Sequence, residues 1–205
     1  MPDLVQAAIT IAVVIFSIVL HEVAHGYAAN YLGDPTARLS GRLTLNPLSH
    51  LDLFGSVLVP VVTWLSGGFI FGWAKPVPYN PYNLKAARFS EAFVAAAGPA
   101  TNLLLALVFG LAIRLFGDIL PDGVLFVAFI VTVANIALFI FNLIPVPPLD
   151  GSKILASVLP LHVAQKMLSL EKYGFLLVFL VILVAWRVIS PVISATFSLI
   201  TGLSF

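Results

Sequence analysis

The sequence contains no cysteine and few charged residues. Without cysteine, its 205 residues can form no disulfide framework, no thiolate metal site and no cysteine nucleophile, so any metal must be bound by His, Asp, Glu or water. Asp, Glu, Lys and Arg make up 9% of the chain, against about 25% in soluble domains. The net charge of +1 excludes the basic field that binds nucleic acid, and the lack of charge blocks excludes disorder.

Long apolar runs take the place of the missing charges. Apolar residues make up 60% of the chain, and the mean hydropathy is +1.09. Several runs approach the roughly 20 residues that cross a bilayer core. They span residues 5–29, 53–71, 93–115, 124–144 and 173–190, the last with a tail to 205. We expect an all-α polytopic membrane protein with about four to six transmembrane helices, integral to the cell membrane.

The second run differs from the others. It contains Pro60 and Gly67-Gly68, and it continues into the proline-rich segment FGWAKPVPYNP, which cannot continue a helix. We therefore expect a re-entrant or β-hairpin-like membrane element between the first and third runs. No repeat or soluble linker divides the chain. This predicts a single domain over 1–205, with a core at 5–160 and a C-terminal helix or helices at 173–205.

Three polar clusters interrupt the apolar chain: HEVAH at 21–25, GPATN at 98–102 and NLIPVPPLDG at 142–151. An ionisable group in the middle of a membrane costs at least about 2.5 to 3.5 kcal/mol, so such groups are candidates for function. We expect the three clusters to meet in the folded protein.

HEVAH has the spacing of a metal site. His21 and His25 are four residues apart, which places them on one face of a helix, as two imidazoles that share a metal require. In HExxH the glutamate, here Glu22, is the general base that deprotonates the attacking water. The alternative is a hydrogen-bonded cluster of polar residues at a helix end.

A catalytic zinc usually has three protein ligands, so a third is needed. Asp150 is the best candidate, because Pro147 and Pro148 end the preceding helix and Gly151 permits a tight turn. Alternatively, Asp150 caps a short helix at residues 152–159. His50 is a rival ligand, although a loop or interfacial histidine is its simpler interpretation.

Asn102 and Asn142 are amides inside apolar runs. They either bond across helices or hold a substrate carbonyl and its oxyanion. Asn135, in the middle of the fourth run, is interpreted as a cross-helix contact. Gly98-Pro99 would let another backbone approach closely.

The ordered set HEVAH, GPATN and NLIPVPPLDG resembles the site-2 protease family of intramembrane zinc metalloproteases, in its compact bacterial and archaeal branch, over roughly residues 10 to 155. The resemblance implies one Zn²⁺ held by His21, His25 and Asp150, with Glu22 as the catalytic base and Asn142 beside the substrate. It also implies a membrane-protein partner, cleaved within or near a transmembrane helix as in regulated intramembrane proteolysis. No PDZ or CBS domain is expected, and the oligomeric state stays open.

The site sets the direction of the helices. His21 and His25 lie at the C-terminal end of the first run, and Asp150 lies just past the C-terminal end of the fourth. These two runs must then run in parallel, while the third run must oppose them. Basic residues then gather on the side of the site, which the positive-inside rule places in the cytoplasm. They are Arg38, Arg42, Lys75, Lys85, Arg88, Lys153, Lys166 and Lys172. A divalent-metal transporter and a non-catalytic relative that binds membrane helices remain as alternatives.

Overall fold

The computed structural model describes residues 4–52, 55, 58–59, 74–85 and 87–204. All regular elements in these residues are helical, as expected, and none is a strand. The α-helices are α1 (Leu4–Tyr31), α2 (Thr36–Leu39), α4 (Ala87–Phe116), α5 (Asp122–Asn142), α6 (Asp150–Val158), α7 (Leu161–Leu168) and α8 (Gly174–Thr201). The 3₁₀ helices are η1 (Pro47–His50), η3 (Pro81–Asn83) and η4 (Ser169–Tyr173).

Three of these helices are long and apolar enough to cross a membrane: α1, the part of α4 from Phe89 to Phe116, and α5. Leu161–Leu183 and Arg187–Thr201 meet the same criteria only together, and they are bent by 69° relative to each other. The described residues therefore hold three spans, or four if this bent pair is one span, against the four to six expected. The expected re-entrant element at 53–71 lies almost wholly outside the described residues.

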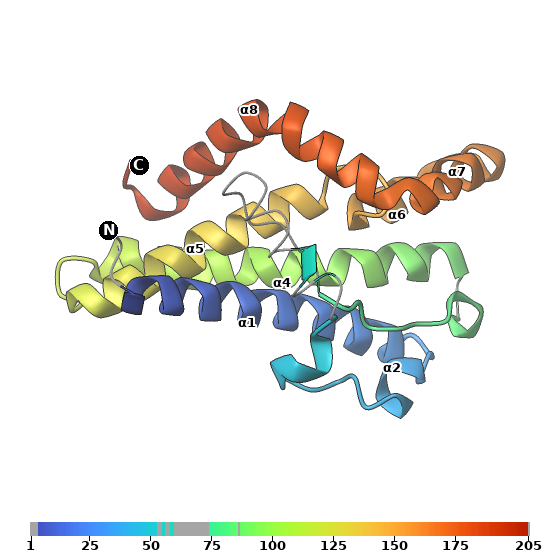
Figure 1. The fold of residues 1–205 in the computed structure, drawn as a ribbon, viewed down its shortest axis with the longest axis horizontal. Helices are drawn as coiled ribbons and strands as arrows, with labels where there is room; N and C mark the ends of the chain where they lie inside the picture. The colour runs from blue at the N-terminus through green and yellow to red at the C-terminus, as the bar shows by residue number, and fades with distance from the viewer. Residues whose placement is uncertain (1–3, 53–54, 56–57, 60–73, 86, 205) are drawn as a thin grey trace.

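The helices run as the sequence required. In Figure 1, α1 and α5 run in the same direction, α4 runs the opposite way, and the two termini lie at the same end of the bundle. The helix α4 packs against both α1 and α5, which brings HEVAH, the first half of α4 and α6 to the opposite end. Lipid offers no hydrogen bonds, so these spans satisfy their backbones as helices.

The turn between α5 and α6 fixes where Asp150 lies. Three prolines after Ile144 prevent α5 from continuing. A Cβ at Gly151 would collide with the carbonyl oxygen of Leu143, so only glycine allows the first turn of α6 to lie this close to the end of α5. Asp150 is thereby placed against α1.

The second half of α8 is anchored on α4 and α5. Its buried apolar residues form one cluster with Ala106 and Ile136, and Phe197 meets Phe129 edge to face at 5.2 Å between ring centroids. The first half of α8 contributes Gly174, Phe175 and Val178 to the wall of the cavity described below.

Asp34 anchors the segment that precedes α4. Its carboxylate accepts hydrogen bonds from the Asn80 backbone N–H at 2.6 Å, from Asn83 Nδ2 at 2.8 Å and from Thr36 Oγ1. Burial raises the pKa of Asp34, but the hydrogen bonds from Thr36, Asn83 and Asn80 outweigh it and hold the pKa below its usual range. This contact holds segment 74–83, and with it Val77, beside the end of α1.

Candidate metal centre

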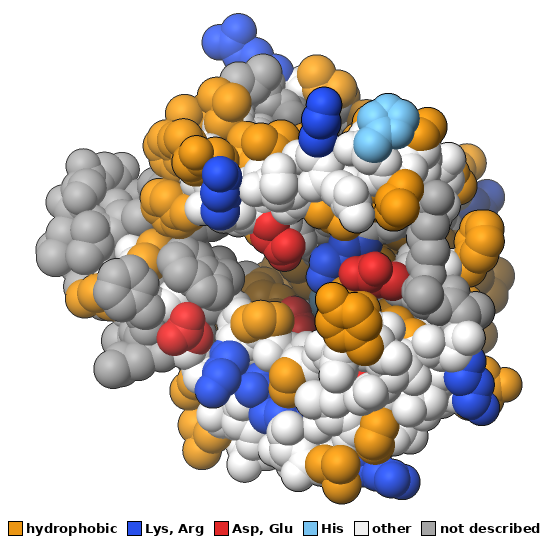
Figure 2. Space-filling model, turned by 90° about the vertical axis from the view of Figure 1, so that its right-hand side faces the viewer, with side chains coloured by type: hydrophobic (Ala, Val, Ile, Leu, Met, Phe, Trp, Pro, Cys, Tyr) orange, Lys and Arg blue, Asp and Glu red, His pale blue; other side chains and the backbone are white. Residues whose placement is uncertain are grey.

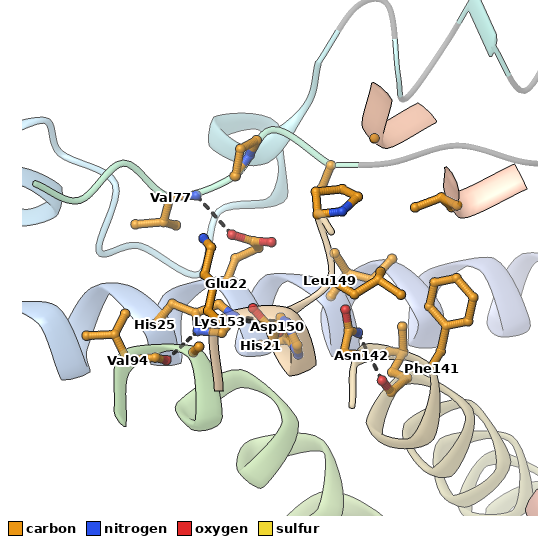
Figure 3. Close-up of a pocket in the computed structure, with 18 of the residues that line it drawn as sticks. His21, Glu22, His25, Val77, Val94, Phe141, Asn142, Leu149, Asp150 and Lys153 are labelled. Carbon is orange, nitrogen blue, oxygen red and sulfur yellow. Dashed lines mark hydrogen bonds and ion pairs between the residues drawn. The ribbon is translucent and has the colours of Figure 1, made fainter. Parts of the chain in front are cut away.

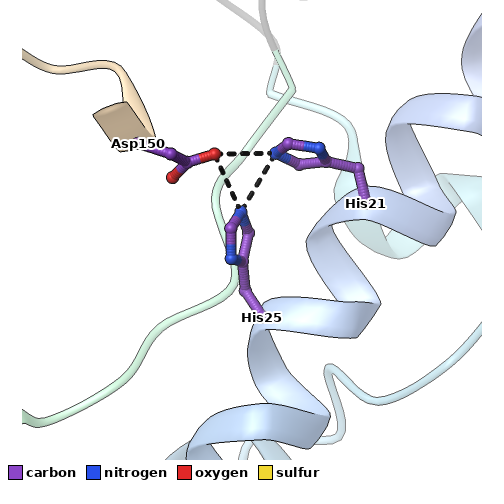
Figure 4. Close-up of side chains that lie close together, drawn as sticks. All are labelled: His21, His25 and Asp150. Carbon is purple, nitrogen blue, oxygen red and sulfur yellow. Dashed lines mark hydrogen bonds and ion pairs between the residues drawn. The ribbon is translucent and has the colours of Figure 1, made fainter. Parts of the chain in front are cut away.

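His21, His25 and Asp150 converge at one end of the bundle. The Nε2 atoms of the two imidazoles lie 3.0 Å apart, and Asp150 Oδ2 lies 3.2 Å from that of His21 and 3.3 Å from that of His25. Figure 4 shows the two rings projecting from successive turns of α1 toward the carboxylate on α6. Among the described residues this is the group of His, Asp and Glu side chains that could hold a metal, with its ligand atoms within 4.8 Å of one another.

Asp150 does not cap its helix. The N-cap of α6 is Leu149 and has no side-chain cap hydrogen bond, while Asp150 is the first helical residue and directs Oδ2 at the imidazoles. As a metal ligand, this carboxyl would bind in its ionised form.

The outer nitrogens of the two imidazoles are also held. His25 Nδ1 lies 2.7 Å from the carbonyl oxygen of Val94, which can only accept, so Nδ1 carries a proton and Nε2 is the nitrogen that faces Asp150. His21 Nδ1 lies 2.5 Å from Asn102 Oδ1. Metal-bound histidines have such outer partners as a rule.

The residues fit a bound cation. Asp150 Oδ2 is buried and has no hydrogen-bond partner, so an unpaired oxygen acceptor lies between the Nε2 atoms of the two imidazoles. Gly98 keeps the space in front of the rings open, because a Cβ there would lie 2.6 Å from His21 Nε2 and closer still to His25 Nε2. The sequence suggested that this glycine admits a neighbouring backbone; in the structure it admits two imidazoles.

Glu22 stands beside this group. Its Oε2 accepts a hydrogen bond of 2.9 Å from the backbone N–H of Val77, and Figure 3 shows the carboxylate turned from α1 toward that segment. The adjacent residues His21 and Glu22 thus face different sides: the imidazole points at Asp150, and the carboxylate borders the open space above it.

A cavity of about 650 Å³ connects these side chains. Glu22, Asp150 and Asn142 line it, and apolar residues from α1, α5 and α8 form much of the rest of its wall. Figure 2 looks onto the site end of the bundle, where basic and acidic side chains lie at a hollow and further Lys and Arg surround it. At the opposite end, Arg114 donates to the carbonyl oxygen of Leu199.

The two candidate amides occupy different environments. Asn142 lines the cavity and donates from Nδ2 to the carbonyl oxygen of Leu138 at 2.9 Å. Asn102 is 0% exposed and contacts His21 and Asn135 instead of the cavity, which differs from the substrate contact considered for it. Asn135 makes the expected cross-helix contact.

His50 is not part of the group. It is buried in η1, and its Nε2 lies 2.9 Å from the carbonyl oxygen of Thr44. Sequence reasoning missed the partners Val94 and Val77, which act through backbone atoms that no side-chain pattern marks. It also missed Lys153, which lines the cavity with its ammonium 5.1 Å from the centre of the Tyr79 ring.

Fold and site together define a multi-pass, all-helical membrane protein with a candidate metal centre at one end of its spans. The model of peptidase family M50, the site-2 protease family, matches residues 9–124 and 112–186. The chain therefore belongs to this family of metalloproteases, and the assignment from its sequence motifs is confirmed.

Curated relatives agree with this membership. The Bacillus subtilis protein named "Putative zinc metalloprotease YwhC" is 41% identical over 177 residues, which are 83% of this chain and 77% of that protein. Two proteins named "Putative zinc metalloprotease Rip2" are 32% identical in Mycolicibacterium smegmatis and 33% in Mycobacterium tuberculosis H37Rv. They match over 80% and 82% of this chain, and in each case over 62% of their own length. No solved structure matches the chain.

Proposed function

We propose that this chain is an intramembrane zinc endopeptidase that hydrolyses peptide bonds within or near transmembrane helices of other membrane proteins. The observation that carries the proposal is the convergence of His21, His25 and Asp150 within 4.8 Å at the end of a membrane span. Family membership supports the reaction class, and the burial of ionisable groups at a span end supports its location.

His21 and His25 would hold the zinc through Nε2, and Asp150 through Oδ2. When bound, zinc polarises a carbonyl and lowers the pKa of water, so that the water can lose a proton and attack the carbonyl near neutral pH. Because the ligands collect at one depth, at the floor of a cavity, the arrangement favours hydrolysis over transport, which requires sites along a path.

Glu22 acts as the general base and then as the general acid. Its carboxylate takes a proton from the attacking water and delivers it to the leaving amine. The Val77 N–H that bonds Oε2 leaves Oε1 to accept this proton, and it orients the carboxylate along the edge of the cavity.

Asn142 acts on the substrate side of the cavity. One hydrogen of Nδ2 is donated to Leu138, so the side chain is held, and the second can be donated to the oxygen of the scissile carbonyl. The carbonyls of a substrate helix are occupied by its own hydrogen bonds, so the substrate must unwind locally before it enters. Helices with Gly, Pro or polar residues near the scissile bond are the expected substrates.

The site faces the cytoplasm in the proposed orientation. The basic residues predicted to share the side of the site lie in α2, α6, α7, η4, the start of α4 and the neighbouring connections, at the same end of the bundle as Asp150. Asp118 and Asp122 lie in the α4–α5 turn at the other end. The positive-inside rule then places the termini outside and the cavity inside the cell.

The test is a cleavage assay with the purified full chain in lipid nanodiscs, zinc and a single-span peptide. Glu22→Gln should retain zinc and lose about 10²- to 10⁴-fold in cleavage rate, because it removes proton transfer and leaves the ligands intact. A matched control is Glu171→Gln, which changes an acidic residue elsewhere in the cavity wall. Wild-type cleavage by Glu22→Gln would contradict the base assignment, and zinc-independent cleavage would contradict the reaction.

A further inference from the structure

A chain of hydrogen bonds links His21 to three other buried side chains. Asn102 on α4 meets His21 through Oδ1 and donates from Nδ2 to Asn135 Oδ1 on α5, at 2.7 Å. Asn135 Nδ2 donates to Ser17 Oγ at 2.9 Å. Ser17 lies one helical turn before His21, so the chain of bonds begins and ends on α1. We name Ser17, Asn102 and Asn135 the amide bridge; none of them is more than 3% exposed.

The Val131 carbonyl oxygen fixes the direction of every bond in this chain of hydrogen bonds. Asn135 also lies 2.8 Å from that oxygen, which can only accept, so the Asn135 atom that contacts it must be the donor Nδ2. Asn135 therefore presents Oδ1 to Asn102. The Asn102 atom in that contact must in turn be Nδ2, which leaves Oδ1 facing His21.

His21 has one tautomer that satisfies this partner. Asn102 Oδ1 accepts and cannot donate, so His21 Nδ1 must carry a proton, and in the neutral ring Nε2 then carries the lone pair. Nε2 is the atom that lies 3.2 Å from Asp150 Oδ2. The other tautomer would place two acceptors against each other at Nδ1 and a proton in the metal position.

We propose that Asn135 and Ser17 are positioning residues for the metal centre, which act through Asn102 to hold His21 in the Nδ1–H tautomer with its Nε2 ready to bind zinc. The inference deepens the proposed function and rests on it where zinc is concerned. The tautomer itself is a property of the metal-free chain and can be tested without zinc or substrate.

Helix association alone does not require this arrangement. A polar contact between membrane helices contributes about 0.6 kcal/mol on average, and any pair of amides or hydroxyls can supply it. Thr132, one turn before Asn135 and equally buried, bonds the carbonyl oxygen of Ala128 in its own helix. The amide bridge instead ends on an imidazole nitrogen, where its direction decides which atom is free.

The first test is ¹⁵N NMR of the metal-free wild-type protein in nanodiscs, with the His21 signals assigned by their loss in His21→Ala. In the neutral ring, the shifts should report a protonated Nδ1 and an unprotonated Nε2. A neutral His21 ring with its proton on Nε2 would overturn the proposal. Because no zinc is present, failure of the wild type to bind zinc would count against the proposed function alone.

The second test compares zinc affinities by chelator competition. Asn135→Leu leaves the Asn102 amide free to turn over, so both tautomers of His21 become populated and the affinity should fall by about 10-fold or more, as outer-partner changes do. Thr132→Val, the matched control on the same helix, should change the affinity by less than about twofold. An unchanged affinity in Asn135→Leu would overturn the proposal.

A rescue variant separates positioning from packing. In Asn135→Leu combined with Asn102→Asp, a carboxylate faces His21 Nδ1; it can only accept, so it restores the Nδ1–H tautomer without Asn135. The double variant should recover most of the zinc affinity that Asn135→Leu loses, together with the wild-type ¹⁵N pattern. Loss of affinity with the wild-type tautomer retained in Asn135→Leu, and no recovery in the double variant, would assign the effect to packing and refute the positioning role.

Discussion

Substitution of Gly98 by alanine should remove zinc binding while leaving the bundle folded. A Cβ at this position would lie 2.6 Å from both Cε1 and Nε2 of His21 and closer still to Nε2 of His25. Non-bonded carbon contacts settle at about 3.5 to 4.0 Å, so both rings would have to retreat by roughly 1 Å. Metal-ligand distances tolerate only about 0.2 Å.

The displaced rings have somewhere to go, because they border the cavity of about 650 Å³. Alanine is also the better helix former by about 1 kcal/mol, so α4 itself does not lose stability through its backbone. The expected result is a loss of zinc affinity beyond the 10- to 100-fold, approximately, that changes in outer partners produce. Zinc content and chelator competition measure the affinity, and thermal unfolding of the metal-free protein measures the fold.

The matched control is Gly123→Ala at the start of α5, where an added Cβ meets nothing within 4 Å. It should bind zinc as the wild type does. Wild-type zinc affinity in Gly98→Ala would show that the rings do not hold the metal in the positions seen here, and it would refute the reasoning.

Three further predictions concern Asp150, Gly151 and Asp34. Asp150→Asn should lose zinc, since the neutral amide replaces the charged ligand; wild-type zinc content by elemental analysis would remove Asp150 from the ligand set. Gly151→Ala should weaken zinc binding without changing any ligand, because the new Cβ collides with the Leu143 carbonyl oxygen and displaces α6; equal chelator competition curves for variant and wild type would contradict this. Asp34→Asn should destabilise the fold by roughly 1.5 to 3 kcal/mol, the value of hydrogen bonds to a charged group. Because its folded pKa is lowered, this contribution is present above the unfolded pKa of about 3.9 and is lost as the pH falls through the folded pKa, so thermal unfolding curves of the two proteins should converge at acid pH.

The residues of the candidate metal centre could be predicted because they depend on local geometry. The spacing of His21 and His25 places them on one helix face wherever that helix lies, and the prolines before Asp150 end α5 in any packing. The relative directions of α1, α4 and α5 then followed from the requirement that the polar clusters meet. The fold class followed from composition, because a chain with so few charges has to satisfy its backbone within helices.

The outer partners could not be predicted because they depend on how the helices are rotated against one another. The sequence shows that Asn102 is a buried amide, but whether it faces the cavity or the back of His21 is decided by the packing of α4 on α1. The contact between Glu22 and Val77 involves a backbone N–H from a connection whose course no periodicity describes. Gly98 was recognised as a place of close approach, but its neighbour was identified only in three dimensions.

The parallel course of α1 and α5 sets the order in which the site can be made. His21 and His25 enter the membrane with the first span, whereas Asp150 follows two later spans, and α6 reaches α1 only when the turn at Gly151 has closed on the end of α5. During synthesis, the chain therefore carries two imidazoles without their carboxylate until most of the bundle is in place. The carboxylate arrives last, so under the proposed function metal binding would report that the helices have assembled.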